Sequence, residues 1–102
     1  MRHHVYALKQ PKHRDRPYVV DFQNNLLSDM STRLVAPLQK LSSTNHAEII
    51  DELMPIVIVD GEQFVLFTQE AAAYPVKGLG LALADLTSQS AVLTNALDRL
   101  VG

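Results

Sequence analysis

The 102-residue sequence predicts a single, mostly β domain of the α+β class, in which a small antiparallel sheet or barrel precedes a terminal helix. Three observations support this prediction. Short β-branched and aromatic runs fill the first two thirds of the chain, an Asp-Gly pair separates two apolar runs, and leucines recur at helical spacing near the end. The composition, 47% apolar and 20% charged, is typical of a globular protein and argues against disorder.

The N-terminal third predicts three strands. Residues 4–8 ("HVYAL") and 18–22 ("YVVDF") flank a polar, proline-containing loop, which is the pattern of a long hairpin. Residues 33–39 ("RLVAPLQ") form the third candidate strand. Pro37 cannot donate a backbone hydrogen bond, so we expect an edge strand or a bulge there.

The strongest local prediction is a hairpin over residues 55–68. Asp60 and Gly61 suit the positive φ values of a type I′ turn. The flanking runs 56–59 and 64–67 are apolar at every position, which indicates that both faces of the hairpin are covered. One face can meet the core of the domain, so the other requires a further element or a second copy of the chain.

Two helices are predicted after this hairpin. Residues 68–74 ("TQEAAAY") form a short one, with Thr68 as its cap and Pro75 just beyond its end. The longer one lies within residues 85–101 and is capped by Thr87 or Ser88; its apolar stripe contains Leu86, Leu93, Leu97 and Leu100. Residues 41–54 are compatible with either a short helix or an irregular loop.

Composition and charge indicate where the protein is located and which kinds of partner it can bind. The sequence has no cysteine, no signal-peptide pattern and no apolar run long enough to span a membrane, so we expect a soluble cytoplasmic protein. Residues 1–40 contain seven Lys/Arg and three Asp/Glu, whereas residues 41–102 contain two and eight. Much of the basic excess lies in residues 9–16, either a solvated loop or a patch for an acidic partner. No aromatic residue interrupts it, so we expect no direct nucleic-acid contact.

The chemistry-bearing residues do not form a recognisable catalytic or metal-binding pattern. The histidines at 3, 4, 13 and 46 are expected on the surface, and adjacent strand residues point to opposite faces, which makes His3 and His4 a poor chelate. The sequence "GLGLAL" at 78–83 lacks the third glycine of a dinucleotide-binding loop. We therefore predict no catalytic residue, no metal and no cofactor, and a protein that is not an enzyme.

Several segments together resemble the CcdB family of gyrase-poisoning toxins. They are "YVVDFQNNLLS" at 18–28, "TRLVAPL" at 32–38, "FVLFTQEAAAYPVKGLG" at 64–80 and the amphipathic C-terminal segment. The segments "VDFQNNLL" and "TQEAAAYPV" are each moderately specific, and they occur in the family's order over nearly the whole chain. The resemblance identifies residues 1–102 as one CcdB-like toxin domain.

The resemblance implies a fold, a function and partners. The fold is an SH3-like antiparallel sheet or barrel with a short internal helix and a long C-terminal helix. Family members are homodimers that bind the A subunit of bacterial DNA gyrase and trap its cleaved DNA complex, and a CcdA-type antitoxin neutralises them. By the family match, the gyrase-binding residues are Leu26, Leu27, Asp98, Arg99, Val101 and Gly102.

The C-terminus departs from the family pattern, which ends in an aromatic or apolar residue followed by x-Gly-Ile. This sequence ends "NALDRLVG" and has no tryptophan. A central aromatic anchor is typically worth about 2–4 kcal/mol, so its loss predicts weakened poisoning. Two alternatives remain open. One is an inactive relative that still binds its antitoxin. The other is a MazF-like endoribonuclease, since "RPYVVDF" at 16–22 also resembles that toxin group and supplies Asp21, with Arg33 further along the chain.

Overall fold

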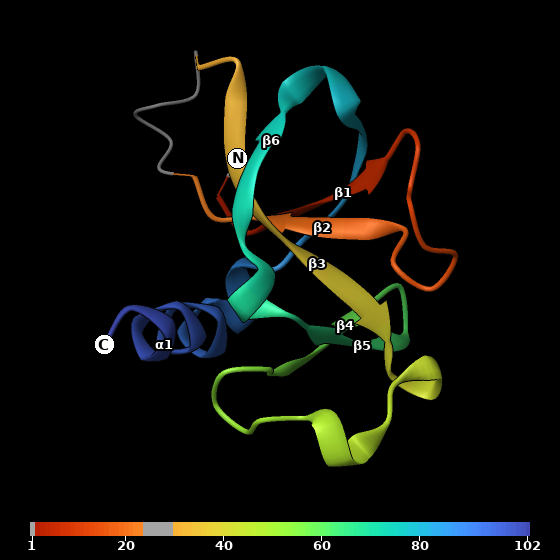
Figure 1. Ribbon diagram of the computed structural model, residues 1–102. Helices are drawn as coiled ribbons and strands as arrows, with labels where there is room; N and C mark the ends of the chain where they lie inside the picture. Colours follow the sequence, from red (N-terminus) through yellow and green to blue (C-terminus); the bar gives the residue numbers. More distant parts are fainter. Residues whose placement is uncertain (1, 24–29) are drawn as a thin grey trace.

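The computed structural model describes residues 2–23 and 30–102. In this part of the chain, seven antiparallel strands form one curled sheet in the order β4-β5-β3-β2-β1-β7, with β6 pairing to β3 beside β5 (Figure 1). The strands are β1 (His4–Leu8), β2 (Tyr18–Asp21), β3 (Thr32–Lys40), β4 (Ile56–Val59), β5 (Glu62–Leu66), β6 (Ala72–Pro75) and β7 (Leu79–Asp85). Helix α1 (Ser90–Val101) follows. This architecture confirms the predicted mostly β, SH3-like α+β fold.

The first three predicted strands are confirmed, but β3 is central rather than an edge. It pairs with β2 along one side, and along the other it changes partner from β6 to β5. Val35 is the last residue paired with β6 and Leu38 the first paired with β5. Pro37 lies between them, where the ladder is interrupted and a missing N–H is tolerated. Its carbonyl accepts a bond of 2.9 Å from the Phe67 N–H.

The β4–β5 hairpin is confirmed, with φ values of 52° at Asp60 and 77° at Gly61. Strand β4 alternates: Val57 and Val59 are buried, whereas Ile56 and Ile58 are 44% and 54% exposed. The chain itself therefore covers one face of β4. Cover for the other face by a second copy stays a prediction.

The predicted helix over 68–74 is wrong. Residues 68–70 make one 3₁₀ turn, and β6 then pairs antiparallel with the first half of β3, from Ala72 opposite Val35 to Pro75 opposite Thr32. The three alanines favour a helix locally, but pairing to β3 supplies backbone hydrogen bonds that outweigh this small propensity. Thr68 is fully buried and makes no capping bond.

Residues 79–84 had no predicted element and Asp85 was placed at the start of the predicted helix, but residues 79–85 form β7 beside β1. Helix α1 begins at Ser90, later than predicted, after a 3₁₀ turn over 87–89. Neither Thr87 nor Ser88 caps it. Instead the Asp85 carboxylate accepts bonds from the N–H and hydroxyl of Thr87 and closes the preceding turn. The ambiguous 41–54 segment contains two short 3₁₀ turns, at 41–43 and 46–48.

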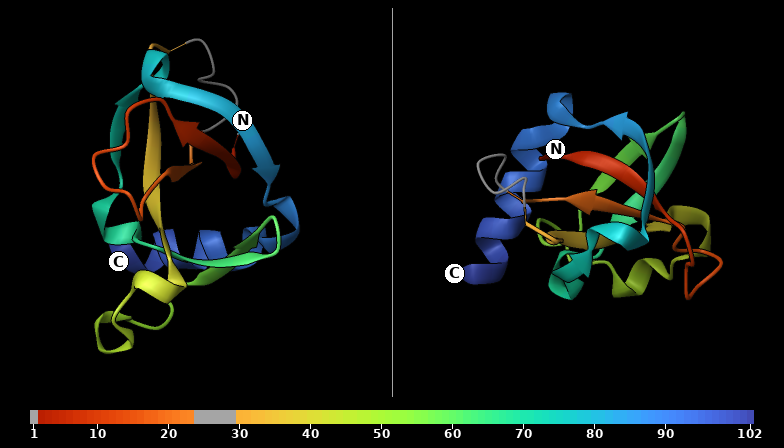
Figure 2. Two further views of the ribbon diagram at one scale, coloured as in Figure 1. Left: turned by 90° about the vertical axis from the view of Figure 1, so that its right-hand side faces the viewer. Right: turned by 90° about the horizontal axis from the view of Figure 1, so that it is seen from above.

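Helix α1 lies across one end of the curled sheet (Figure 2). Its buried residues, Leu93 and Ala96, face the sheet, and Leu97 packs beside them. Leu100, predicted in the same stripe, is 39% exposed. The core under the helix contains Val5, Val20, Leu38, Val57, Phe64, Leu66 and Leu86. This packing fixes the helix along one side and leaves its other side and its C-terminal turn exposed.

Candidate protein-binding site

An open groove of about 810 Å³ runs along the exposed side of α1. One wall is a stripe of the helix at spacings of three and four residues, which is one helical face. The opposite wall comes from the segment just before β4. The lining residues are Val92, Asn95, Asp98, Arg99 and Gly102 on the helix side and Glu52 and Pro55 on the other.

The groove brings together three of the six residues expected to bind gyrase: Asp98, Arg99 and Gly102. Val101 is 77% exposed on the same last turn of the helix, although it does not line the groove. Leu26 and Leu27 lie outside the described residues, so their position relative to the groove stays a prediction.

Glu52 is a residue of this site that sequence reasoning missed. Its carboxylate forms an ion pair with the Arg99 guanidinium across the groove, and both side chains are more than 60% exposed. Val92 and Asn95 could have been found from their spacing to Arg99 on one helical face. Nothing in the sequence indicates that residues 52–55 fold back against the end of α1. Glu52 and Arg99 are 47 positions apart in the chain.

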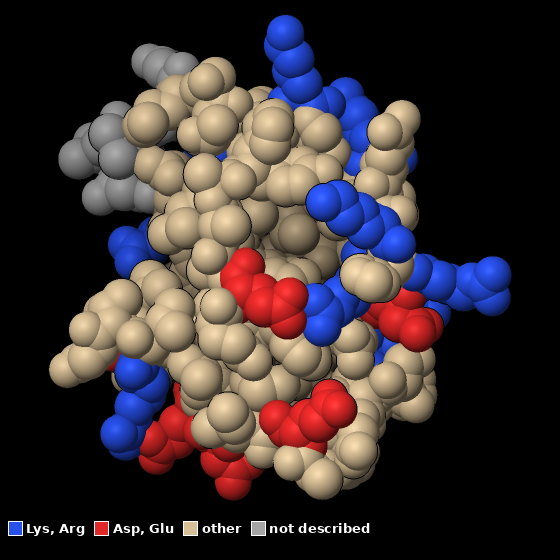
Figure 3. Space-filling model, in the orientation of Figure 1, with Lys and Arg blue, Asp and Glu red and all other residues tan. Residues whose placement is uncertain are grey.

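Charge on the molecule is unevenly distributed. In Figure 3, basic side chains project at the top and right of the view and also lie along its left edge, whereas most acidic side chains lie in the lower half. This agrees with the acidic excess of residues 41–102, in which Lys77 and Arg99 are the only Lys or Arg. Arg99 is already paired with Glu52, so the carboxylate of Asp98 gives the groove a net negative charge. A partner with a basic side chain beside an apolar one would match these walls.

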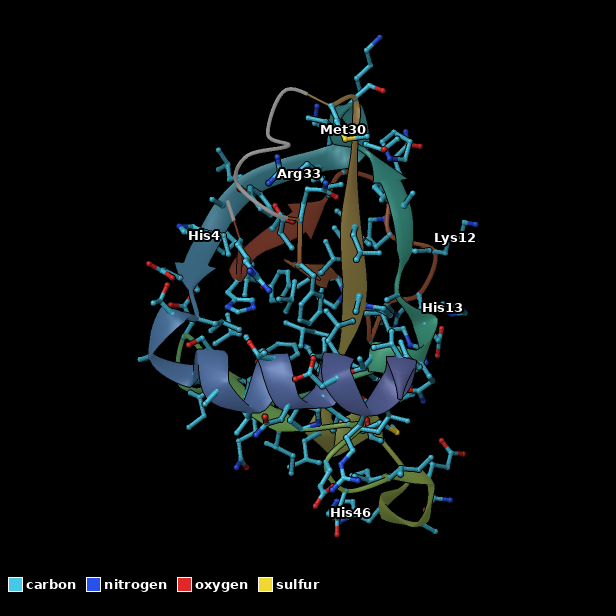
Figure 4. The ribbon with its side chains drawn as sticks, turned by 90° about the vertical axis from the view of Figure 1, so that its left-hand side faces the viewer. His4, Lys12, His13, Met30, Arg33 and His46 are labelled. Atoms are coloured by element: carbon cyan, nitrogen blue, oxygen red, sulfur yellow. The ribbon has the colours of Figure 1, made fainter. Side chains whose placement is uncertain are left out.

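The two residues that the endoribonuclease alternative needs, Asp21 and Arg33, do come together. The Arg33 Nε and Nη2 atoms donate to Asp21 Oδ2 at 3.0 and 2.8 Å, and the Gln23 N–H donates to Oδ1 at 2.7 Å. Figure 4 labels Arg33 on the inner side of β3. The Asp21 and Arg33 residues are 0% and 6% exposed, so this pair joins β2 to β3 and is shielded from a phosphate in solution.

The histidines do not share a site. Figure 4 places His4, His13 and His46 at three separate positions on the periphery of the molecule. His3 is the exception to the expected surface placement, because its side chain is buried. In residues 2–23 and 30–102, no group of three or more His, Asp or Glu side chains is arranged to hold a metal ion.

In the basic loop at 9–16, Arg16 at the C-terminal end is held against the sheet, whereas the other basic side chains are exposed to solvent. Arg16 pairs with Glu70 at 2.7 Å, donates to Gln39, and lies 4.3 Å from the centre of the Phe67 ring. It therefore anchors the loop to the sheet through a cation–π contact and an ion pair. The other basic side chains of the loop, those of Lys9, Lys12 and Arg14, are exposed.

Comparison with known families agrees with this reading of the fold. The profile of the CcdB protein family matches residues 2–102, essentially the whole chain. Membership of this family supports a toxin of a toxin–antitoxin system. Among the described residues, no helix is long and apolar enough to cross a membrane. The length of the match and the mostly β fold with its C-terminal helix lead to one conclusion: the chain belongs to the CcdB family.

Proposed function

We propose that this protein binds the A subunit of bacterial DNA gyrase and traps the enzyme with cleaved DNA. The observation that carries the proposal is the convergence of Asp98, Arg99 and Gly102, three residues assigned by family resemblance, on one open groove. The groove is lined by apolar side chains, Val92 and Pro55, together with the charged side chains of Glu52, Asp98 and Arg99. Protein-binding surfaces typically combine apolar and polar groups in this way.

The partner approaches the exposed side and the last turn of α1. Val101 supplies the exposed apolar side chain of that turn. It is smaller than the aromatic anchor typical of a strong interface, and such anchors are worth about 2–4 kcal/mol, or roughly 30- to 1,000-fold in affinity. We therefore propose a competent scaffold with weakened poisoning. Leu26 and Leu27 remain proposed contacts by the family match.

The protein acts as a homodimer in this proposal. Ile56 and Ile58 form an exposed apolar face on β4, and a second copy would remove it from water. A CcdA-type antitoxin is the proposed neutralising partner, and the exposed basic side chains of the 9–16 loop suit acidic residues on such a partner. A mass equal to one chain at micromolar concentration in sedimentation or light scattering would exclude the dimer.

The deciding experiment is a DNA cleavage assay with purified gyrase, supercoiled DNA and ATP. It compares the 102-residue chain with a version extended by Trp-Gly-Ile, and each of these with its Asp98→Lys variant. Glu62→Lys is the matched control, because it reverses an exposed carboxylate on the β4–β5 hairpin, outside the groove. We expect linear DNA to accumulate with the chain, more strongly with the extension, and to decrease in the Asp98→Lys variants alone.

The outcomes of the assay distinguish the gyrase-binding proposal from the two alternatives. Cleavage only with the extended version means that the scaffold recognises gyrase and that its tip limits poisoning. No cleavage with either version rejects gyrase as the target. The inactive antitoxin-binding relative then becomes the preferred interpretation if the folded chain still binds a CcdA-type antitoxin. The endoribonuclease alternative requires RNA cleavage by the chain in the absence of gyrase.

A further inference from the structure

His3 occupies an unusual position between three parts of the fold. Its N–H donates to the Asp21 carbonyl at the end of β2, and its carbonyl accepts a bond of 2.9 Å from the Leu86 N–H, just before the turn that leads into α1. Its φ of 63° is left-handed, a conformation uncommon for residues other than glycine. The backbone of this one residue therefore joins β1, β2 and the start of the helical segment.

The imidazole ring of His3 is held in a largely apolar setting. The residue is 6% exposed, and its ring packs against the Phe22 ring in a T-shaped arrangement with the two centroids 5.7 Å apart. Its Nε2 atom is buried and has no hydrogen-bond partner in the described part of the chain. A neutral ring can tolerate this arrangement, whereas a protonated ring would bury an N–H donor and a charge without an acceptor.

Neither of the nearby carboxylates bonds to the Nε2 atom, and both already accept bonds from other donors. Asp21 accepts from Arg33 and from the Gln23 N–H, and Asp85 accepts from the N–H and hydroxyl of Thr87. Burial, and then the positive charge of Arg2, lowers the pKa of His3 below its ordinary value of 6.5. The charges of Asp21 and Asp85 act in the opposite direction but are the smaller influences.

We propose that His3 is a pH-sensitive latch: its neutral ring keeps the start of β1, the end of β2 and the segment leading into α1 together, and its protonation opens this junction. The sign follows from linkage. The unfolded chain binds the proton more readily than the folded chain does, so the stabilisation is fully present above pH 6.5. It decreases as the pH falls below 6.5 towards the lower pKa of the folded state.

Opening the latch affects the helix before it affects the sheet. Leu86, whose N–H bonds to His3, is 2% exposed and belongs to the core cluster beneath α1. The β2–β3 ladder and the Asp21–Arg33 ion pair remain in place, since neither depends on the His3 ring. Mild acid therefore loosens the docking of α1 first.

The test begins with the unmodified protein, so it does not depend on a variant that folds. An NMR titration between pH 4.5 and 8 follows the ring signals of His3, and hydrogen exchange follows the Leu86 amide. We expect the pKa of His3 to lie below its ordinary value of 6.5. We also expect the Leu86 amide to lose protection before the amides of β2 and β3 as the pH falls.

Variants then identify the group responsible. Urea unfolding across the same pH range compares the protein with His3→Phe, with His3→Asn, which suits a left-handed φ, and with the control His13→Asn. Each pKa unit between the unfolded and folded imidazole changes the unfolding equilibrium constant about tenfold across the transition. We expect this pH dependence in the parent and in His13→Asn, and its loss in at least one His3 variant that folds. A His3 pKa at or above 6.5, or Leu86 protection unchanged in acid, overturns the proposal.

Discussion

Two arginine–carboxylate pairs in this molecule have the same chemistry and opposite surroundings. Arg33 and Asp21 meet at 2.8 Å with side chains that are 7% and 1% exposed, at the junction of β2 and β3. Arg99 and Glu52 meet across the groove beside α1 with side chains that are 65% and 61% exposed. The first pair is removed from water and the second remains solvated.

The difference decides what each pair does. Breaking a buried pair leaves a charge without a partner in a medium that solvates it poorly, so the pair constrains the fold. An exposed pair exchanges its partner for water at little cost, so it can be replaced by a charge from another protein. RNA cleavage would require Asp21 and Arg33, which are buried, whereas gyrase binding would involve Arg99, which is exposed.

The largest predicted effect tests the buried pair. Arg33→Met removes both guanidinium bonds from the buried Asp21 carboxylate, and we expect the free energy of unfolding to decrease by about 3–5 kcal/mol. Urea denaturation at pH 7 measures this change. The matched control is Arg99→Met, the same substitution at the exposed pair, for which we expect a loss of less than about 1 kcal/mol. Equal losses in the two variants would contradict the distinction.

An intermediate effect is predicted for a neutral contact. The Gln89 side chain bonds to both the N–H and the carbonyl of Ile58, each at 3.3 Å, on the outer edge of β4. The contact is exposed but occupies two backbone groups. We expect Gln89→Ala to reduce stability by about 0.5–1 kcal/mol and to accelerate exchange of the Ile58 amide. An unchanged exchange rate would mean that the Gln89 side chain does not protect the Ile58 amide and that water can replace it.

The strands were predictable from the sequence because their signals are local. The β1, β2 and β3 runs and the Asp60-Gly61 turn depend on residue type and on neighbours within a few positions. The error at 68–74 and the omission of β7 have one physical cause. Both segments are strands because another strand lies beside them, and the residues that form that neighbour are more than 30 positions away.

The candidate site was partly predictable for the same reason. Asp98, Arg99 and Gly102 came from a family resemblance near one end of the chain, and α1 keeps them together. Glu52 required knowledge of the tertiary fold. The burial of His3 was also hidden, because the sequence pattern at the N-terminus does not reveal the left-handed turn that places its ring against Phe22.

The smallest predicted effect on stability concerns the exposed pair itself. In a double-mutant cycle of Glu52→Gln and Arg99→Met, we expect a coupling energy of roughly 0.2–1 kcal/mol that disappears near 1 M salt, where the Debye length is about 3 Å. Urea denaturation at low and high salt measures it. A coupling energy above about 2 kcal/mol would mean that the exposed pair stabilises the fold as strongly as a buried pair does, which would contradict the distinction drawn between them.

We expect the Glu52–Arg99 pair to affect binding to gyrase more than it affects the stability of the fold. If Arg99 contacts gyrase, its bond to Glu52 must first open, and Glu52→Gln removes that step. We therefore expect the variant to bind the gyrase A subunit more tightly, by up to about fivefold, while losing less than about 1 kcal/mol of stability, in a titration by calorimetry or surface plasmon resonance. Weaker binding would mean that Glu52 is itself a contact. Either change would locate the partner in the groove, whereas unchanged binding would exclude a role for this wall.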